Sequence, residues 1–296
     1  MLLKIIEREH IDISKWNDLV TSKMGQSIFS HSYYLDEVAE NWCIVTDNDY
    51  SCGIAVPFTI RLGVKCFTTP IFVRYLEWFG SQENWNSASI LIEKYFSGGV
   101  IQVPLNLINQ QQFRLFQIID GDRRLGSQAT RMLAKAKHFK IETADSSETL
   151  SILEIIKSEL PAKIATLNTK SVATLKSLVL NLAQKNLIKS FAIKIENEII
   201  AGLILIEFNG MLLYLKGASF SDYKKKGAMY ALMNHAIEYA QQKNLKFDFG
   251  GSSAEGVRRF NLNLGGSDVE YGIYHSEKAP FWFKELKRIK NLWIKK

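Results

Sequence analysis

The sequence is poor in residues that build covalent or metal-linked frameworks. It has three cysteines, Cys43, Cys52 and Cys66, whose spacing fits no zinc motif. The opening residues, MLLKIIEREH, are apolar for too short a run to predict a signal peptide or a membrane anchor. An odd cysteine count without such a signal predicts reduced thiols and a cytoplasmic protein. Because the five histidines are scattered, we expect no metal site and no tightly bound cofactor.

Proline and long apolar runs are also scarce. Five prolines and 18 glycines among 296 residues form no low-complexity linker, and 47% hydrophobic residues exclude wholesale disorder. No stretch approaches the roughly 18 apolar residues that suggest a membrane-spanning helix. The length instead suits two domains of about 100–200 residues each.

Acidic residues are unevenly distributed and become few toward the end of the chain. Residues 1–120 carry nine basic and 13 acidic side chains, whereas residues 121–277 carry 21 and 16. The last 19 residues, 278–296, carry seven basic side chains and one acidic. The formal net charge of +7 therefore belongs to the second half, which favours an anionic partner there. A solvated lysine-rich surface explains the same excess.

The hydrophobic patterning predicts an α+β (mixed α/β) fold in two parts. The best boundary is Gly121-Asp122, which gives domains at 1–120 and 121–277, followed by a C-terminal helix at 278–296. After a basic helix at 127–139, the second part reads as a strand, two helices, three strands, a helix, a strand, a helix and a strand. Asn209-Gly210 predicts a tight hairpin between two of these strands. The first part repeats the pattern loosely, which suggests two related units.

One candidate site lies where a strand ending near residue 218 leads into a long helix at 226–243. Lys224, Lys225 and Lys226 precede Gly227 and Ala228 at the start of that helix. A helix N-terminus directs backbone N–H groups and partial positive charge outward, so this segment could hold a phosphate. A helix that simply begins with solvated lysines is an equally good interpretation.

A second candidate site follows the next strand. Asp248 precedes Gly250-Gly251, and either faces a site or caps the turn that contains Ser252. Arg258 and Arg259 follow on a short helix, with Phe260 beside them. An arginine can bind a carboxylate or phosphate with two parallel hydrogen bonds, although each of these is also an ordinary surface residue.

Taken in order, these segments resemble the FemAB-like branch of the GNAT acyltransferase superfamily. Upstream, residues 127–136 are similar to the basic helix that opens that family's second domain. The segments that carry the resemblance are 213–218, 224–228, 247–252 and 256–266, together with Trp16, Phe29, Tyr33, Tyr34, Leu35 and Trp42 in the first part.

The resemblance implies two tandem GNAT-like domains, each with a mainly antiparallel sheet flanked by helices. It also implies transfer of an acyl or aminoacyl group to an amine. In the peptidoglycan-bridge members the donor is aminoacyl-tRNA and the acceptor is a muropeptide precursor, whereas other relatives use acyl-CoA as co-substrate. Residues 224–228 would then lie near the donor phosphates. Asp248, Arg258 and Asn261 would take catalytic roles, and Ser252, Arg259 and Phe260 would bind the acceptor.

Two positions depart from the family pattern. Met229 stands where the pyrophosphate motif has glycine or alanine, and Asn261 stands where the family has a lysine thought to stabilise the transition state. Asparagine donates a hydrogen bond but brings no charge. These departures keep open an alternative of another class, a non-catalytic GNAT-like module that binds an anionic ligand.

The C-terminal segment 280–296 reads as a basic amphipathic helix, with Trp282, Leu286, Ile289, Leu292 and Trp293 on its apolar face. One interpretation is a peripheral contact with an anionic membrane. We favour the other, in which the apolar face packs on the first domain. The sequence sets no oligomeric state.

Overall fold

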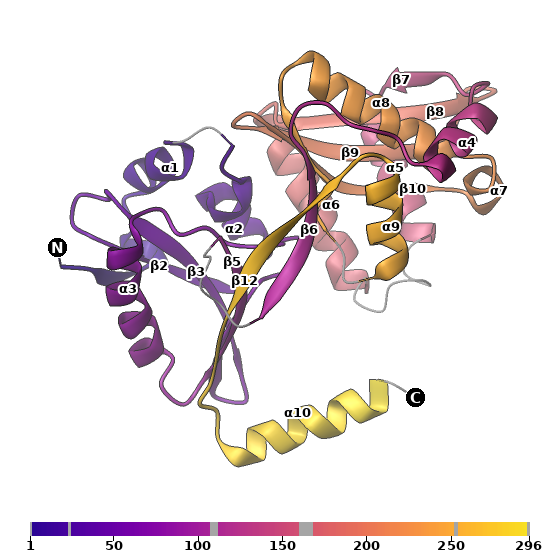
Figure 1. Ribbon diagram of the computed structural model, residues 1–296. Coiled ribbons are helices and arrows are strands. Elements are labelled where there is room, and N and C mark those ends of the chain that lie inside the picture. Colours follow the sequence, from indigo (N-terminus) through magenta and orange to yellow (C-terminus); the bar gives the residue numbers. More distant parts are fainter. Residues whose placement is uncertain (1, 23–24, 107–111, 160–167, 252–253, 295–296) are drawn as a thin grey trace. The chain divides into compact units, whose positions relative to one another are not determined.

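The computed structural model describes residues 2–22, 25–106, 112–159, 168–251 and 254–294 (Figure 1). The chain divides into two compact units. Unit 1 comprises Met1–Ser22, Phe29–Arg114 and Tyr271–Lys296, and unit 2 comprises Lys23–Ile28 and Leu115–Glu270. Apart from the short segment Lys23–Ile28, the chain passes between the units inside two strands, β6 (Phe113–Ile119) and β12 (Ser267–Glu277). The domain ranges 1–120 and 121–277 divide the chain close to these crossings and remain a proposal.

Unit 1 is a mixed sheet flanked by helices. Its strands lie in the order β1-β2-β3-β4-β5-β12, and the pair β4–β5 is parallel while the other pairs are antiparallel. The elements are β1 (Lys4–Glu7), α1 (Ile13–Thr21), α2 (Ser32–Val38), β2 (Asn41–Thr46), β3 (Gly53–Arg61), β4 (Val64–Thr68), α3 (Gln82–Tyr95), β5 (Val100–Leu105), the end of β12 and α10 (Phe281–Ile294).

Local signals account for the helix starts in unit 1. Asp12 accepts a hydrogen bond from the Lys15 amide at the start of α1, and Ser81 caps α3 in the same way through the Asn84 amide. Trp16 and Val20 on the inner face of α1 pack into a core with Ile44 of β2. This core is separate from that of unit 2.

Unit 2 has the same topology. Its strands lie in the order β6-β11-β10-β9-β8-β7, and β10–β11 is the parallel pair. Its elements are β6, α4 (Ser127–Lys135), β7 (Ile141–Thr143), α5 (Ser146–Glu159), α6 (Thr169–Gln184), β8 (Ile188–Ile195), β9 (Glu198–Phe208), β10 (Met211–Ser219), α7 (Ser221–Lys224), α8 (Ala228–Gln242), β11 (Lys246–Asp248), α9 (Glu255–Asn263) and the start of β12.

The two units therefore repeat one plan. In each, three antiparallel pairs lead to a parallel pair whose strands are joined by a long helix, α3 in unit 1 and α8 in unit 2, where the short helix α7 precedes α8. The predicted mixed α/β fold with two tandem units is confirmed. The helix α8 buries Leu232, Ala236, Ile237 and Ala240, as its apolar stripe predicts. It begins at Ala228 rather than at the predicted Lys226, because Gly227 in the left-handed region (φ 92°) interrupts the helical backbone.

Candidate functional site

The parallel strands of unit 2 separate after a short contact. β11 pairs with β10 over Met211, Leu212 and Leu213, whereas β10 continues to Ser219. A register shift lies between Tyr214 and Lys216 on the opposite side of β10, where it pairs with β9. Since β11 ends at Asp248, its pairing with β10 leaves residues 214–219 beyond the parallel contact. We call residues 214–219 the β10 edge.

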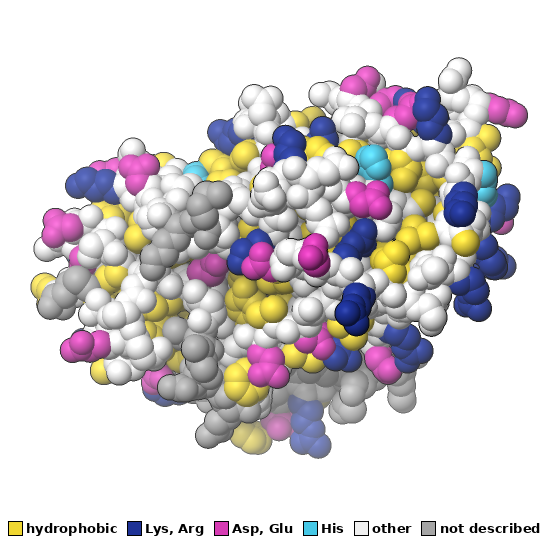
Figure 2. All heavy atoms as spheres, turned by 45° about the horizontal axis from the view of Figure 1, so that its top comes forward, with side chains coloured by type: hydrophobic (Ala, Val, Ile, Leu, Met, Phe, Trp, Pro, Cys, Tyr) yellow, Lys and Arg dark blue, Asp and Glu magenta, His cyan; other side chains and the backbone are white. Residues whose placement is uncertain are grey.

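The predicted phosphate segment lies directly after this edge. Lys224, Lys225 and Lys226 are exposed, and basic side chains gather at the end of unit 2 that carries α7 (Figures 1 and 2). The amides of Lys226 and Gly227 donate to the carbonyl oxygens of Tyr223 (3.1 Å) and Lys224 (3.2 Å). Those two amides are therefore engaged within the turn.

Gly227 has a different role from the one expected. A Cβ added at this position would lie 2.6 Å from the carbonyl oxygen of Met132 in α4, and the φ of 92° is one that other residues rarely adopt. Gly227 and Ala228 are both buried. The glycine thus permits close packing between α4 and the start of α8.

Asp248 is fully buried at the end of β11. Its Oδ1 accepts a hydrogen bond from the Gly250 amide at 2.6 Å, which stabilises the turn that carries the chain away from β10. Of the two interpretations of Asp248, this contact supports the capping one. Ser252, in the same turn, lies outside the described residues.

Two of the predicted catalytic residues are joined by a chain of hydrogen bonds that we call the Asn261 network: Asn261, Gln117, Asp268 and Arg258. Asn261 Nδ2 donates to Gln117 Oε1 (3.0 Å), and Gln117 Nε2 donates to Asp268 Oδ1 (2.8 Å). Arg258 binds the same carboxylate through two nitrogens. This hydrogen-bonded arginine holds the pKa of Asp268 below its usual range.

Sequence reasoning missed two members of this network. Gln117 is a buried polar residue on β6, between the buried Phe116 and the apolar Ile118, and Asp268 lies near the start of β12. A glutamine inside an apolar strand is a detectable signal, because a buried amide needs partners. Asp268 offers no comparable signal, since acidic residues at strand starts are ordinary.

The remaining predicted residues of α9 lie outside the network. Arg259 is exposed and pairs with Glu255 at 2.9 Å. Phe260 packs edge-to-face against Tyr230 of α8, with ring centroids 4.6 Å apart, and joins the core of unit 2. Neither residue touches the Asn261 network through a hydrogen bond or ion pair that involves its side chain.

Cysteine and metal chemistry find little support in the described residues. All three cysteines are buried, and burial raises the pKa of the Cys43 thiol to about 12 and that of Cys52 to about 11. Both thiols are therefore protonated at neutral pH and poor nucleophiles. Among the described residues, no three His, Cys, Asp or Glu side chains come together in a way that could hold a metal ion.

Comparison with known proteins finds a family match within unit 2. Residues 123–266 match the family described as acetyltransferase (GNAT) domain. We call this segment the GNAT domain after that match. No relative was found among curated protein sequences.

Solved structures extend the likeness to most of the chain. FemX is 10% identical, with a TM-score of 0.66 over 94% of this chain and 98% of its own. L-PGS from Bacillus licheniformis is 12% identical, with a TM-score of 0.55 over 93% of this chain and 95% of its own. At these identities the likeness is one of fold. With the family match, it confirms the resemblance to the FemAB-like GNAT branch.

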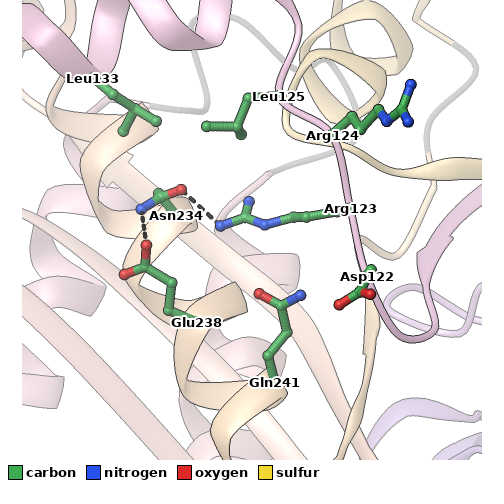
Figure 3. A pocket seen from close by; sticks show the side chains of 8 residues that line it. All are labelled: Asp122, Arg123, Arg124, Leu125, Leu133, Asn234, Glu238 and Gln241. Atoms are coloured by element: carbon green, nitrogen blue, oxygen red, sulfur yellow. Dashed lines mark hydrogen bonds between the residues drawn. The ribbon is translucent and has the colours of Figure 1, made fainter.

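The GNAT domain also contains an open pocket of about 830 Å³ that sequence reasoning did not anticipate (Figure 3). Arg123 extends into it and donates to Asn234 Oδ1 (2.7 Å) and to the Leu264 carbonyl oxygen (3.0 Å). Asn234 in turn donates to Glu238 (2.8 Å), and Arg124 points away. None of the predicted site residues lines this pocket. The full lining is Asp122, Arg123, Arg124, Leu125, Leu133, Asn234, Glu238 and Gln241.

Proposed function

We propose that this protein is a cytoplasmic N-acyltransferase whose GNAT domain transfers an acyl or aminoacyl group from an activated donor to an amine. The observation that carries the proposal is the separation of β10 and β11 beyond Leu213. The extended arm of a donor would lie along β10 beyond this pairing, with its carbonyl carbon held near an incoming amine. Positioning of this kind supplies much of the rate enhancement in a reaction that needs few catalytic side chains.

The donor is proposed to be an acyl-CoA or an aminoacyl-tRNA, both of which carry phosphates. Lys224, Lys225 and Lys226 are exposed after β10 and supply positive charge for those phosphates. In the reaction, the acceptor nitrogen forms a bond to the acyl carbon and loses a proton. The thioester C–S bond of acyl-CoA, or the ester C–O bond of aminoacyl-tRNA, breaks, and the CoA thiol or the tRNA hydroxyl leaves with a proton. The acceptor is proposed to be a muropeptide-like amine, as in the relatives that the sequence resembles.

The Asn261 network and Asp248 are proposed to support this site rather than to react. Both Asn261 and Asp248 are buried, and their hydrogen bonds run to Gln117 and to the Gly250 amide. Asp248 fixes the turn after β11, and the Asn261 network fixes the start of β12. Both contacts would thereby position β11 beside β10. Arg259 and Ser252 remain the proposed acceptor contacts, whereas the packing of Phe260 against Tyr230 favours a structural role.

Binding of three ligands to the full chain tests the proposal: acetyl-CoA, a UDP-linked muropeptide and charged tRNA, each followed by a product assay. The informative variant is Lys224→Glu/Lys225→Glu, because both side chains are exposed. Lys137→Glu/Lys176→Glu is the matched control, with the same charge change at exposed positions on unit 2. We expect the first variant to weaken donor binding at least tenfold and the control to change it less than twofold. Equal effects would contradict a donor site at this segment.

A tryptophan at Gly227 is a poor probe of the same segment. Its side chain would meet the Met132 carbonyl oxygen, so a loss of binding would report disturbed packing between α4 and α8. The charge reversals avoid this ambiguity because they lie on the surface.

A binding module without turnover is the second candidate, and Asn261 favours it. This residue stands where the family has a lysine, and its side-chain amide is buried and donates to Gln117. It therefore brings no positive charge to a transition state. Saturable binding of a donor or muropeptide with no product from any donor would establish the module.

A further inference from the structure

The described part of the C-terminal helix α10 carries a row of exposed apolar side chains. Trp282, Leu286 and Ile289 are 47%, 48% and 50% exposed, and Phe281 is 78% exposed. The first three are spaced four and three residues apart, so they share one side of the helix. Isolated exposed apolar residues are common, but a row of them along one helix marks an interaction surface.

A different side of this helix packs on unit 1. Phe283 is buried with Ala279 against Val64 and Cys66 of β4 and Val100 of β5. This contact attaches the first turn of α10 to the sheet of unit 1. Of the face that we expected to pack on the first domain, Trp282, Leu286 and Ile289 stay about half exposed, and this contact does not include them. The side chains of Leu292 and Trp293 lie outside the described part of the structure.

The charge around the exposed row identifies the kind of partner. Residues 278–296 carry seven basic side chains and one acidic. Lys278 pairs with Glu93 of unit 1 (2.6 Å), and Arg288 lies near Glu285 (3.6 Å), which still leaves a large positive excess in the segment. An apolar row bordered by cations complements an interface that has an apolar interior and an anionic surface. An anionic lipid bilayer has both properties.

The length of the helix restricts how it meets a bilayer. α10 has 14 residues, which corresponds to about 21 Å, shorter than the roughly 30 Å hydrocarbon core. None of the described helices is both long enough and apolar enough to cross a membrane. Self-association through this face would bring two cationic segments together, which like-charge repulsion disfavours. The arrangement fits a helix that lies in the plane of the surface.

We propose that α10 binds the protein to the surface of an anionic lipid bilayer, with Trp282, Leu286 and Ile289 inserted among the acyl chains. The basic side chains of Lys284 and Arg288 contact the lipid headgroups. This inference does not depend on the transferase activity, because it uses only residues of α10 and unit 1. It places whatever reaction the GNAT domain performs at a membrane surface.

Sedimentation of the full chain with vesicles tests the proposal. One set of vesicles contains phosphatidylglycerol and phosphatidylcholine, and the other contains phosphatidylcholine alone. The protein is expected to sediment with the anionic set at least tenfold more tightly, and added salt is expected to weaken binding because it screens the charges. Leu286→Ser/Ile289→Ser is expected to weaken binding at least tenfold.

Two further variants make the result decisive. Ile90→Ser removes a side chain of α3 that is 69% exposed, and it is expected to leave binding unchanged within twofold. Lys284→Glu/Arg288→Glu is expected to weaken binding to the anionic set most strongly at low salt. The proposal is overturned if the wild-type chain ignores both vesicle sets, or if Leu286→Ser/Ile289→Ser binds like the wild type. It is also overturned if the wild-type chain forms a concentration-dependent dimer without lipid and Leu286→Ser/Ile289→Ser abolishes that dimer.

Discussion

Asn261 on α9 donates a hydrogen bond to Gln117 on β6, across 3.0 Å and 144 positions of sequence. Both side chains are buried, so this hydrogen bond takes the place of one that each amide would otherwise make with water. The contact ties the helix that follows β11 to the strand that precedes the GNAT domain.

Removal of both partners is therefore expected to cost less than the sum of the two single removals. Asn261→Leu leaves the Gln117 oxygen buried without its donor, at a cost of about 1–3 kcal/mol in the free energy of unfolding. Gln117→Leu is expected to behave similarly. In the double variant the costs should fall short of their sum by about 0.5–3 kcal/mol, as residues in contact do. Urea unfolding of the four proteins measures this coupling, and simple additivity would refute the contact.

Alanine substitutions at Gly227 and at two other glycines distinguish steric crowding from backbone strain. Gly227→Ala combines a positive φ with a Cβ 2.6 Å from the Met132 carbonyl oxygen, so it is expected to destabilise by at least about 2 kcal/mol. Gly63→Ala has a φ of 80° but meets nothing within 4 Å, and is expected to cost about 1 kcal/mol. Gly256→Ala meets nothing and has no such φ, so it should be neutral or stabilising. Thermal unfolding that ranks the three otherwise would contradict the packing against α4.

The pair of Arg258 and Asp268 predicts a pH dependence with a definite sign. The pKa of Asp268 is lowered in the folded protein by its hydrogen-bonded arginine. Its contribution is therefore complete above the unfolded pKa of about 3.9, and is lost as the pH falls through the folded value. Arg258→Gln should raise the pKa of Asp268, observed by NMR titration of its carboxyl carbon. The stability advantage of the wild type over this variant should shrink below about pH 4.

A neighbouring arginine provides the control for that titration. Arg259 pairs with Glu255 at an exposed position on the same helix. Arg259→Gln is expected to leave the Asp268 titration unchanged. If both variants move it equally, the shift comes from general charge on α9 rather than from the hydrogen bond.

Arg123 and Arg124 are adjacent but should respond differently to truncation. Arg123 donates to Asn234 and to the Leu264 carbonyl oxygen, and it is half buried, which lowers its pKa. Arg123→Ala is expected to lower the free energy of unfolding by about 2–4 kcal/mol, because hydrogen bonds from a charged donor are strong. Arg124 is exposed and points away from the pocket, so Arg124→Ala should stay within about 0.5 kcal/mol. Chemical denaturation of both variants checks the difference.

The sequence alone determined the features that arise from local patterns. Alternating and helical periodicity predicted the mixed fold, the long helix of unit 2 and the repeat of one plan in both halves. Asn209-Gly210 predicted a tight turn, and both residues adopt positive φ between β9 and β10. These predictions succeed because a turn or an apolar stripe is encoded within a few residues.

Only the tertiary structure decided what the candidate residues do. Gly227 looked like part of a phosphate loop, yet its role is set by the Met132 carbonyl oxygen on a different helix. The meaning of Asn261 depended on Gln117, and that of Arg258 on Asp268 of β12. Trp282 and Phe283 are neighbours with equal apolar character, but only contact with β4 and β5 determines that the second is buried and the first exposed. Such roles arise from pairs distant in sequence, which local patterns do not encode.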